Sequence, residues 1–415
     1  MGYNRAKGNS GVHDDLTATA LVLADGTTRI ALVALDMLGM NDLVVDRVRS
    51  RLSPIEPVLC CSHTHSGPVI FTDEGSSRKN KVYINLVVDQ IVAAVQDAAG
   101  RMAPVTLEYA SGQGTIAINR RERMPNGHIE NGMDPDGVID RTVQVISITG
   151  LKGERVATIV NYACHGTVLG PDNLLASADW IWAMRARVEQ KLGGLVMFLQ
   201  GAAGNLNPSF GYSPDRPWDG TRAFEKVSEL GNAMAEAVSR AVRTGCKPLQ
   251  PLPLKMERVE TWLPTESPAT TARPPKTYMK PVLAALKLPG FMSFVVEHFL
   301  DQRAPWKQRV EARDGYWAVP VRMSALRIGE LAILNIGAEL FTELGLAIKA
   351  GSPGKYTLLV SLADSMVSYV HPAESHAQGG YEVDSAPLLF RYPSRLAATN
   401  GDIVLQAAQS LFRRL

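Results

Sequence analysis

Two histidines, His63 and His65, follow a short apolar run and precede a Ser-Gly-Pro turn. Side chains of an extended strand alternate between its two faces, so this spacing predicts that both imidazoles project from one face at the strand end. Two imidazoles at such a point can hold a metal ion or act on a reacting group. The alternative is one hydrogen-bonded core histidine beside one exposed histidine.

Three further residues whose side chains can bind a metal ion follow strand-like runs elsewhere in the chain: His165, Glu339 and Tyr369. In open α/β sheets, ligands collect outside one set of strand ends. Two imidazoles, a carboxylate and a phenolate make a zinc shell that leaves a position open for water. Zinc lowers the pKa of such a water and polarises a carbonyl, while an arginine and a tyrosine nearby would hold the developing oxyanion.

Each of these residues also has a purely structural interpretation. Glu339 suits the first turn of a helix, Tyr369 suits a buried tyrosine, and Arg120 beside Arg121 suits a solvated pair. Asp36, at the end of a strand, is either a site residue or a cap for the next helix. Cys164 beside His165 raises the alternative of a thiol nucleophile, although the run before it indicates a buried strand.

The elements that must position these residues alternate between strand and helix patterns. The runs 17–23 and 29–35 flank an Ala-Asp-Gly-Thr turn and predict a hairpin, and 40–52 and 80–100 predict helices. Residues 127–137 are polar and predict a loop. We therefore expect an α/β fold with mixed β-sheets layered with helices.

We expect one large domain over residues 1–415, with a proline-rich, apolar helical insertion at about 264–310. Within it, Pro289-Gly290 divides residues 282–303 into two short apolar helices. This apolar pair suits a lid, a membrane-surface contact, a dimer contact or a packed core element.

Composition narrows the function classes. The 415 residues are 46% hydrophobic and carry a formal net charge of +2, and no basic tract indicates a nucleic-acid partner. We expect no signal peptide and no transmembrane segment. The four cysteines show no disulfide or zinc-knuckle spacing, which favours reduced thiols in a cytoplasmic protein.

Several motifs resemble the catalytic domain of the neutral/alkaline non-lysosomal ceramidases, and they occur in the family's order along nearly the whole chain. They are Ser62-His-Thr-His-Ser-Gly-Pro68, Ile118-Asn-Arg120, Asn161-Tyr-Ala-Cys-His165, Gly204-Asn-Leu-Asn-Pro208, Gly337-Ala-Glu339, Ser368-Tyr369 and Gly380-Tyr-Glu382.

The resemblance implies a single Zn²⁺ ion per chain with the ligands His63, His165, Glu339 and Tyr369. It implies that His65 and Tyr381 act on the scissile carbonyl or the water, and that Arg120 contacts the substrate.

The sequence departs from the family at the Gly-Asn-Leu-Asn-Pro turn. Family members carry Gly-Asp-Val-Ser-Pro there, with a serine to which a catalytic role is assigned, whereas this chain has Asn207. Asn207 has no hydroxyl, so it is either a hydrogen-bond donor in the site or a residue of a plain Asn-Pro turn. The chain also ends about 30 residues after Tyr381, so we expect it to lack the family's C-terminal immunoglobulin-like domain.

These observations predict a zinc-dependent hydrolase that cleaves an amide (N-acyl) bond of a small-molecule or lipid substrate by attack of a metal-bound water. Cleavage of an ester, a lactone or a carbohydrate-linked amide is one alternative, and a non-catalytic binding protein on the same scaffold is another. A metallo-β-lactamase-like hydrolase also begins with His-x-His, but that motif continues Asp-His, where Ser66-Gly67 follows here. The sequence does not determine the oligomeric state, and a homo-oligomer is compatible with it.

Overall fold

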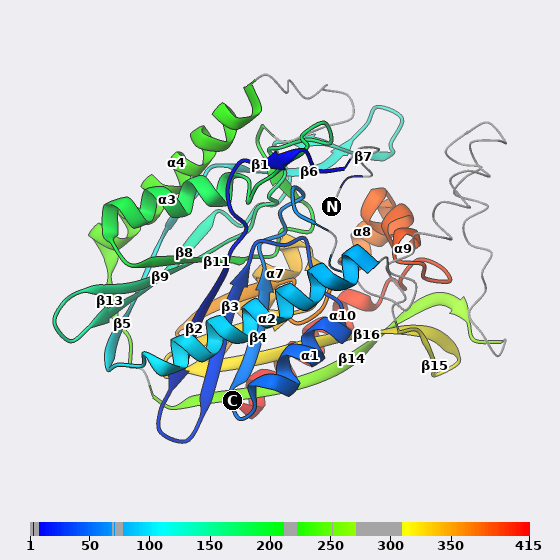
Figure 1. Cartoon of the computed structure of the whole chain (residues 1–415). Helices are drawn as coiled ribbons and strands as arrows, with labels where there is room; N and C mark the ends of the chain where they lie inside the picture. The colour runs from blue at the N-terminus through cyan, green and yellow to red at the C-terminus, as the bar shows by residue number, and fades with distance from the viewer. Residues whose placement is uncertain are drawn as a thin grey trace.

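Two β-sheet layers face each other, and helices cover both outer faces (Figure 1). The computed structural model describes residues 3, 8–68, 70, 78–210, 222–250, 252–270 and 309–415. The predicted α/β class, with mixed sheets layered with helices, is confirmed.

The first layer begins with the predicted hairpin. β2 (Ala18–Ala24) and β3 (Arg29–Leu35) pair antiparallel, and β4 (Glu56–Cys61) pairs parallel with β3. A bridge between Cys60 and Ala363 joins β4 to the chain that follows a second sheet of the same layer. In order, that second sheet consists of β14 (Leu254–Pro268), β16 (Tyr316–Ile328), β17 (Leu331–Ile336) and β19 (Tyr356–Ser361), with β15 (Glu311–Arg313) paired to β16.

The second layer is one five-stranded sheet. Its order is β11 (Leu195–Gln200), β9 (Arg155–Tyr162), β8 (Thr142–Gly150), β5 (Val105–Gln113) and β13 (Lys247–Pro248). β9 and β11 run parallel, so their carboxyl ends meet at one edge of the sheet.

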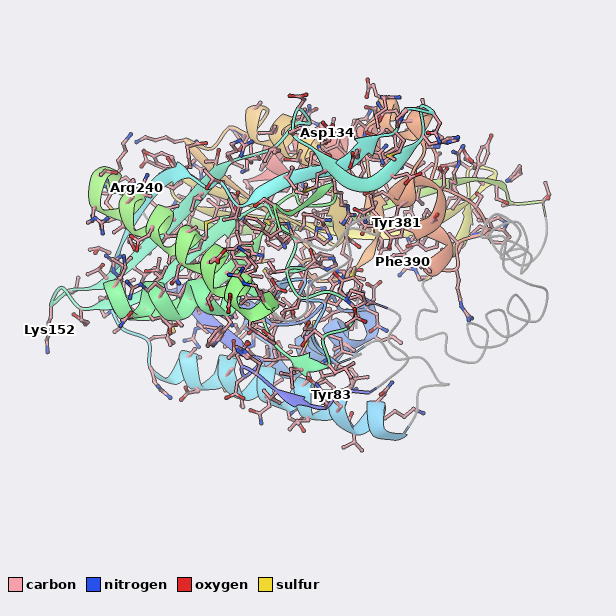
Figure 2. The ribbon with its side chains drawn as sticks, turned by 90° about the horizontal axis from the view of Figure 1, so that it is seen from above. Tyr83, Asp134, Lys152, Arg240, Tyr381 and Phe390 are labelled. Atoms are coloured by element: carbon pink, nitrogen blue, oxygen red, sulfur yellow. The ribbon has the colours of Figure 1, made fainter. Side chains whose placement is uncertain are left out.

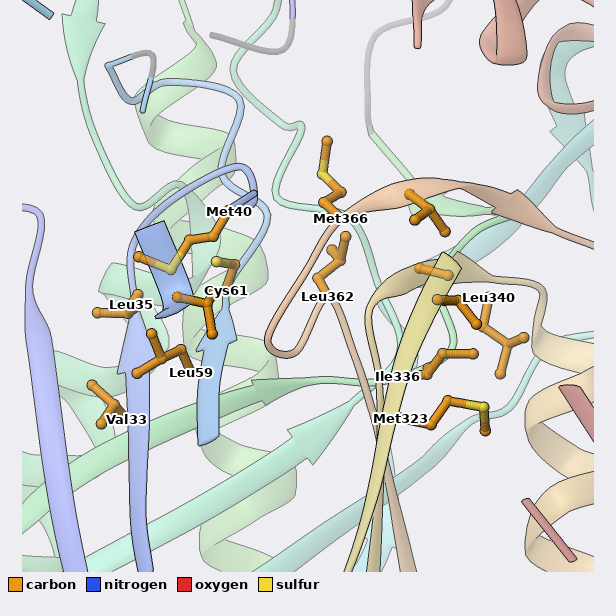
Figure 3. Packing of buried hydrophobic residues seen from close by; sticks show 14 of the residues in the cluster. Val33, Leu35, Met40, Leu59, Cys61, Met323, Ile336, Leu340, Leu362 and Met366 are labelled. Atoms are coloured by element: carbon orange, nitrogen blue, oxygen red, sulfur yellow. The ribbon is translucent and has the colours of Figure 1, made fainter. Parts of the chain in front are cut away.

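Alternation along the strands divides the buried residues between the cores. On β3, Ile30 and Leu32 face the core between the two layers, whereas Val33 and Leu35 face the helices. Cys60 and Cys61 divide in the same way, as expected of neighbours on a strand. Figure 3 shows part of the outer core, with Val33, Leu35 and Cys61 on one side, Met323 and Ile336 on the other, and Leu362 between the two groups. Each large apolar side chain buried in this way contributes roughly 1.5–3 kcal/mol of transfer free energy.

Among the described residues, helices of nine or more residues cover the layers. α1 (Asp42–Leu52), α2 (Arg78–Gly100), α7 (Thr342–Ala350) and α10 (Asn400–Arg414) pack on the first layer, and α3 (Trp180–Leu192) and α4 (Ala223–Gly245) on the second (Figure 1).

α2 is amphipathic, because Ile84, Val88, Ile91 and Val95 are buried one helical turn apart. The stretch Asn80–Gly100 is long and apolar enough to cross a membrane by length and composition, but the core helices of soluble proteins pass the same test. The absence of a transmembrane segment therefore stays a prediction.

Short elements gather at the end of the layers where the candidate site lies. They are β6 (Ala117–Arg123), β7 (Ile129–Asp134), β12 (Leu206–Pro208), β18 (Ala338–Leu340), β20 (Val367–Val370), α8 (Ala373–Gln378), the π-helical turn η2 (Tyr381–Ser385) and α9 (Ala386–Leu389), with β1 (Gly11–Val12) paired to β10 (Leu175–Ala176). The predicted loop at 127–137 is wrong in part, because Ile129–Asp134 pairs with β6 as an antiparallel strand. The hydrogen-bonded partner overrides the polar local sequence.

The predicted insertion at 264–310 is only partly visible. β14 extends through Pro268, so its first residues continue a strand. Residues 271–308, with the apolar pair predicted at 282–303, lie outside the described residues. The single domain over 1–415 stays a prediction.

Candidate metal centre

The first histidine leaves the strand geometry that its spacing predicts. β4 ends at Cys61, and His63 has a left-handed backbone with φ of 65°. Its N–H donates to the carbonyl of Met37 at 2.9 Å, and its Nδ1 lies 2.6 Å from the carbonyl of Leu38. Since a carbonyl only accepts, Nδ1 carries the ring proton, and the Nε2 lone pair is left to face the site. The turn, and not the alternation of a strand, therefore aims this imidazole.

His165 is oriented in the same way from the other layer. β9 ends at Tyr162, and the carbonyl of Leu206 accepts hydrogen bonds from both the N–H of His165, at 3.2 Å, and its Nδ1, at 2.9 Å. Trp180 Nε1 donates to the carbonyl of His165 at 2.8 Å. Burial, with the charge of Arg120, lowers the pKa of His165 to about 4, so the imidazole is neutral at pH 7.

Glu339 supplies a carboxylate between the two imidazoles. It lies in β18 opposite Tyr369 of β20, and α7 begins only at Thr342, so the helix first-turn alternative is wrong. Its Oε2 is 3.2 Å from Nε2 of His63 and 3.3 Å from Nε2 of His165. Burial alone would raise the pKa of Glu339, but the two histidines hold it well below its usual range.

His65 brings a third imidazole to the same point. Its Nε2 is 3.3 Å from Nε2 of His63, and its N–H donates to the carbonyl of Gly166 at 3.3 Å. The ligand atoms of His63, His65 and His165 all lie within 4.8 Å of one another. Burial, with the neighbouring histidines, lowers the pKa of His65 well below its usual value. The ring of Tyr3 meets it edge-on, with the centroids 5.0 Å apart, a contact that no motif indicated.

The donor set fits a divalent cation. The nitrogens of His63 and His165 carry lone pairs, and Glu339 Oε2 has no hydrogen-bond partner among the described residues. Oε2 of Glu339 lies 3.2 Å and 3.3 Å from the two imidazole nitrogens, and lone pairs at these distances repel one another unless a positive charge lies between them. Ligands of a tetrahedral zinc ion with bonds of ordinary length stand about 3.3 Å apart, which matches this spacing.

Two tyrosines flank the carboxylate. Tyr369 lies opposite Glu339 in the pairing of β18 with β20, and its ring centroid is 5.8 Å from that of Tyr381, at the start of η2. Burial and the charge of Glu339 raise the pKa of Tyr369 well above its usual value and that of Tyr381 to about 12. In the metal-free chain both are therefore neutral phenols, which can donate hydrogen bonds. Figure 2 shows Tyr381 near the hairpin that carries Asp134.

Arg120 is buried beside the histidines and is not part of a solvated pair. Its Nη1 lies 3.4 Å from Nε2 of His165 and donates to Oδ1 of Asn207 at 3.3 Å. Its Nη2 is buried and has no hydrogen-bond partner in the described part of the chain. Asn207 Nδ2 donates to Asn131 at 3.4 Å, so Asn207 faces the site and is more than a turn residue.

Gln200, which carried no signal in the sequence, connects the two histidine segments. It ends β11, and its Nε2 donates to the carbonyls of Ser62 at 3.3 Å and Cys164 at 2.8 Å. Its Oε1 accepts from the N–H of Cys164 at 3.3 Å. One buried amide thus fixes the backbone next to both His63 and His165, and it lines a pocket with them and Glu339.

Two other candidates prove to be structural. Asp36 receives hydrogen bonds from Arg185 Nη2 at 2.7 Å and Nη1 at 3.0 Å and from Thr17, so it is neither a helix cap nor a site residue. Cys164 is buried, and burial raises its pKa well above the usual thiol value, which disfavours a thiolate nucleophile.

Asn205 performs a structural task in the same turn as Asn207. Its Oδ1 accepts from the N–H of Thr342, the first residue of α7, at 2.9 Å, and its Nδ2 donates to Glu343 at 2.9 Å. It therefore caps the helix that follows the Glu339 strand.

Comparison with known proteins finds similarity to the neutral ceramidases. Residues 1–201 match the family model "Neutral/alkaline non-lysosomal ceramidase, N-terminal". The neutral ceramidase of Pseudomonas aeruginosa is 27% identical over an alignment that covers 92% of this chain and 65% of that protein. The neutral ceramidase A of Dictyostelium discoideum is 25% identical over 174 residues, 37% of this chain and 24% of that protein.

Solved structures extend the similarity to the whole fold. The crystal structure of the Pseudomonas aeruginosa neutral ceramidase matches all of this chain and 72% of its own, with a TM-score of 0.73 at 20% identity. A ceramidase complexed with C2 matches with a TM-score of 0.72, also at 20% identity, over all of this chain and 73% of its own. The chain is therefore similar to the neutral/alkaline non-lysosomal ceramidases through residues 1–201, and over its whole length it shares the fold of the neutral ceramidase structures.

Proposed function

We propose that this protein is a zinc-dependent hydrolase that cleaves an amide bond. The observation that carries the proposal is that Nε2 of His63 and Nε2 of His165 both lie within 3.3 Å of Oε2 of Glu339, beside the unpaired Nη2 of Arg120. His63, His165, Glu339 and Tyr369 would hold one Zn²⁺ ion. The chemistry that zinc supplies in such a site is activation of water near neutral pH and polarisation of a carbonyl oxygen.

The remaining side chains have separate roles in proton transfer and in stabilisation of the developing negative charge. His65 is neutral and presents Nε2 next to that of His63, so it can accept a proton there and return it to the leaving amine. Tyr381 stays protonated, because its pKa is about 12, and can donate a hydrogen bond to a developing oxyanion. Arg120 Nη2 offers a second, charged donor for the same oxygen.

Asn207 assists through Arg120. Its Oδ1 accepts from Arg120 Nη1 at 3.3 Å, and this bond restrains the guanidinium. It carries no hydroxyl, so water is the nucleophile that this site can supply.

The substrate class comes from the relatives. Two curated relatives are named neutral ceramidases, so a ceramide is the first N-acyl amide to test. Because the chain spans 65% of the length of the Pseudomonas relative, activity on ceramide itself is part of the proposal. An ester, a lactone or a carbohydrate-linked amide would use the same carbonyl chemistry, and cytoplasmic location and a homo-oligomer stay predictions.

The test combines metal analysis with a substrate panel. Purified protein should contain about one zinc per chain and should hydrolyse at least one member of a panel of ceramides, N-acyl amino acids, N-acyl sugars and matched esters. His63→Ala should abolish both properties, whereas His128→Ala, at an exposed histidine outside the cluster, should change neither. Full activity without metal would refute the proposal, and bound zinc with no turnover on any member would favour a binding protein.

A further inference from the structure

A buried carboxylate, Glu382, bridges two neighbouring arginines next to the candidate centre. Its Oε1 accepts from Nε of Arg120 at 2.8 Å, and its Oε2 accepts from Nη1 of Arg121 at 2.8 Å. Only 2% of Glu382 is exposed. The proposed mechanism gives this carboxylate no task.

The local backbone explains how consecutive arginines reach one carboxylate. Neighbours on a regular strand point to opposite faces, but the pairing of β6 with β7 shifts register between Asn119 and Arg121. Asn119 Oδ1 accepts from the N–H of Arg121 at 3.0 Å and holds this irregularity. The bulge therefore turns both guanidinium groups toward Glu382.

The two arginines do different things beyond that shared contact. Arg121 Nη2 donates to the carbonyl of Gly379 at 2.9 Å and to Gln378 at 3.3 Å, and its guanidinium lies 5.3 Å from the ring centroid of Phe341. Those contacts anchor it to the end of α8, and none of them involves His63, His65 or His165. Arg120 instead extends toward His165 and Asn207, so only Arg120 can serve the reaction.

The contacts of Arg120 leave one donor group free. A guanidinium is planar, so a bond at Nε to Glu382 and a bond at Nη1 to Asn207 together fix the plane and the direction of Nη2. This Nη2 is buried, and the described residues give it no acceptor. A buried charged donor without an acceptor is costly, and a substrate oxygen would satisfy it.

We propose that Glu382 is a positioning residue, which acts on the reaction by fixing the Arg120 guanidinium so that Nη2 meets the oxygen of the scissile carbonyl. Glu382 also follows Tyr381 directly in η2, so the same carboxylate ties the Tyr381 backbone to the strand of Arg120. The ion pair with Arg121 holds the Glu382 carboxylate in place, so the carboxylate does not shift when Arg120 moves. This inference rests on the proposed amide hydrolysis.

A double-mutant cycle separates positioning from a general structural role. In zinc-loaded protein, Glu382→Gln should lower kcat/KM on the order of 10²-fold, mostly through kcat, because a misplaced donor loses transition-state contact. Arg120→Gln should cost at least as much. The variant with both changes should stay within roughly twofold of Arg120→Gln alone, because Glu382 has nothing to position once the guanidinium is absent.

Asp140→Asn is the matched control, since Asp140 pairs with Lys349 in an ion pair that touches none of these residues. It should leave kcat/KM within roughly twofold of the wild type, as expected of a site away from the substrate. Losses from Glu382→Gln and Arg120→Gln that multiply in the double variant would overturn the inference.

Glu382→Gln removes the negative charge that pairs with two buried arginines, and the variant can fail to fold for that reason. A second variant tests the inference in that case. Glu382→Asp keeps the charge and is one methylene shorter, so it should retain zinc and its Tm but still lower kcat. Its crystal structure should show the Arg120 guanidinium displaced from Asn207. An undisplaced guanidinium, or unchanged kcat, would contradict the positioning role.

The structural readout also separates the two proposals. If the wild-type protein cleaves no substrate in the panel, the proposed function fails, but the displacement of Arg120 in Glu382→Asp still tests whether Glu382 sets the place of the guanidinium.

Discussion

The candidate centre has two halves that are built differently. Backbone groups hold the histidine half: the carbonyls of Leu38 and Leu206 take the Nδ1 protons of His63 and His165, and Gln200 bonds the main chain next to both. Side chains hold the opposite half, where Arg120 is fixed by Glu382 and Asn207. The first half therefore fixes its two candidate ligands through backbone groups, whereas the second half, which also carries Glu339 and Tyr369, fixes a hydrogen-bond donor for a substrate through side chains.

The elements that carry the two halves also differ. His63 and His165 follow β4 and β9, strands of opposite layers that are buried on both faces. Glu339 and Tyr369 lie on the short paired strands β18 and β20, and Tyr381, with 37% of its surface exposed, begins a π-helical turn. Single-turn π-helices are often found at functional sites.

The largest expected effect contrasts a ligand from each half. His165→Ala should abolish zinc binding and lower kcat/KM by at least roughly 10³-fold, because it removes a neutral nitrogen ligand from a preformed pair. Glu339→Gln should keep weaker zinc binding, since both imidazoles stay fixed by their carbonyls, but should lose comparable activity. Isothermal titration of the apoprotein with zinc, together with kinetics, measures both. Equal zinc affinity in the two variants would remove the distinction between the halves.

A smaller effect tests the backbone support of the histidine half. Gln200→Leu removes the donor to the Ser62 and Cys164 carbonyls while keeping a similar volume. Loss of such outer support lowers metal affinity by roughly 10–100-fold, and we expect zinc affinity to fall in this range. A zinc competition assay at fixed pH measures it, with Gln144→Leu, another buried amide, as the control. Unchanged zinc affinity in a folded Gln200→Leu protein would count against this support.

The third effect concerns the loop after His165. Asp179 accepts from the N–H groups of Val168 and Leu169, and burial, with the charge of Asp14 adding to it, raises its pKa to about 6 from 3.8. Between these values the folded state binds more protons than the unfolded state. The contribution of Asp179 to the free energy of unfolding therefore falls as pH rises through 6. Relative to the wild type, Asp179→Asn should gain roughly 2–3 kcal/mol between pH 4 and pH 7.

Urea unfolding of both apoproteins across that pH range measures the difference. Asparagine cannot accept one of the hydrogen bonds that Asp179 accepts. This loss shifts the stability difference between the two proteins by the same amount at each pH and does not change its dependence on pH. A flat difference between the two proteins would show that Asp179 does not titrate in this range.

The sequence predicted much of the scaffold because its signals are local. The hairpin of β2 and β3, the amphipathic α2 and the apolar run of β9 follow from periodicity that burial in the layers then satisfies. β7 was missed because its polar residues pair with β6 only through the tertiary fold. Strand spacing brought His63 and His65 together for the wrong reason, since a left-handed residue, and not an extended strand, aims the first imidazole.

The candidate site was predicted unevenly. The His-x-His motif marks one half without outside knowledge, whereas Glu339, Tyr369 and Tyr381 were assigned through resemblance to a family. Gln200 and Glu382 act through contacts between segments far apart in the chain, so no local pattern marks them. A Gln at the end of an apolar run and an Arg-Arg pair are the sequence features from which such a search could begin.

The most direct test of the metal centre is a crystal structure of zinc-loaded protein with data collected at the zinc absorption edge. We expect one anomalous peak per chain in contact with Nε2 of His63, Nε2 of His165 and Oε2 of Glu339, with Tyr369 as the fourth protein ligand. An active enzyme without a peak at this position, or with zinc bound elsewhere, would contradict the account.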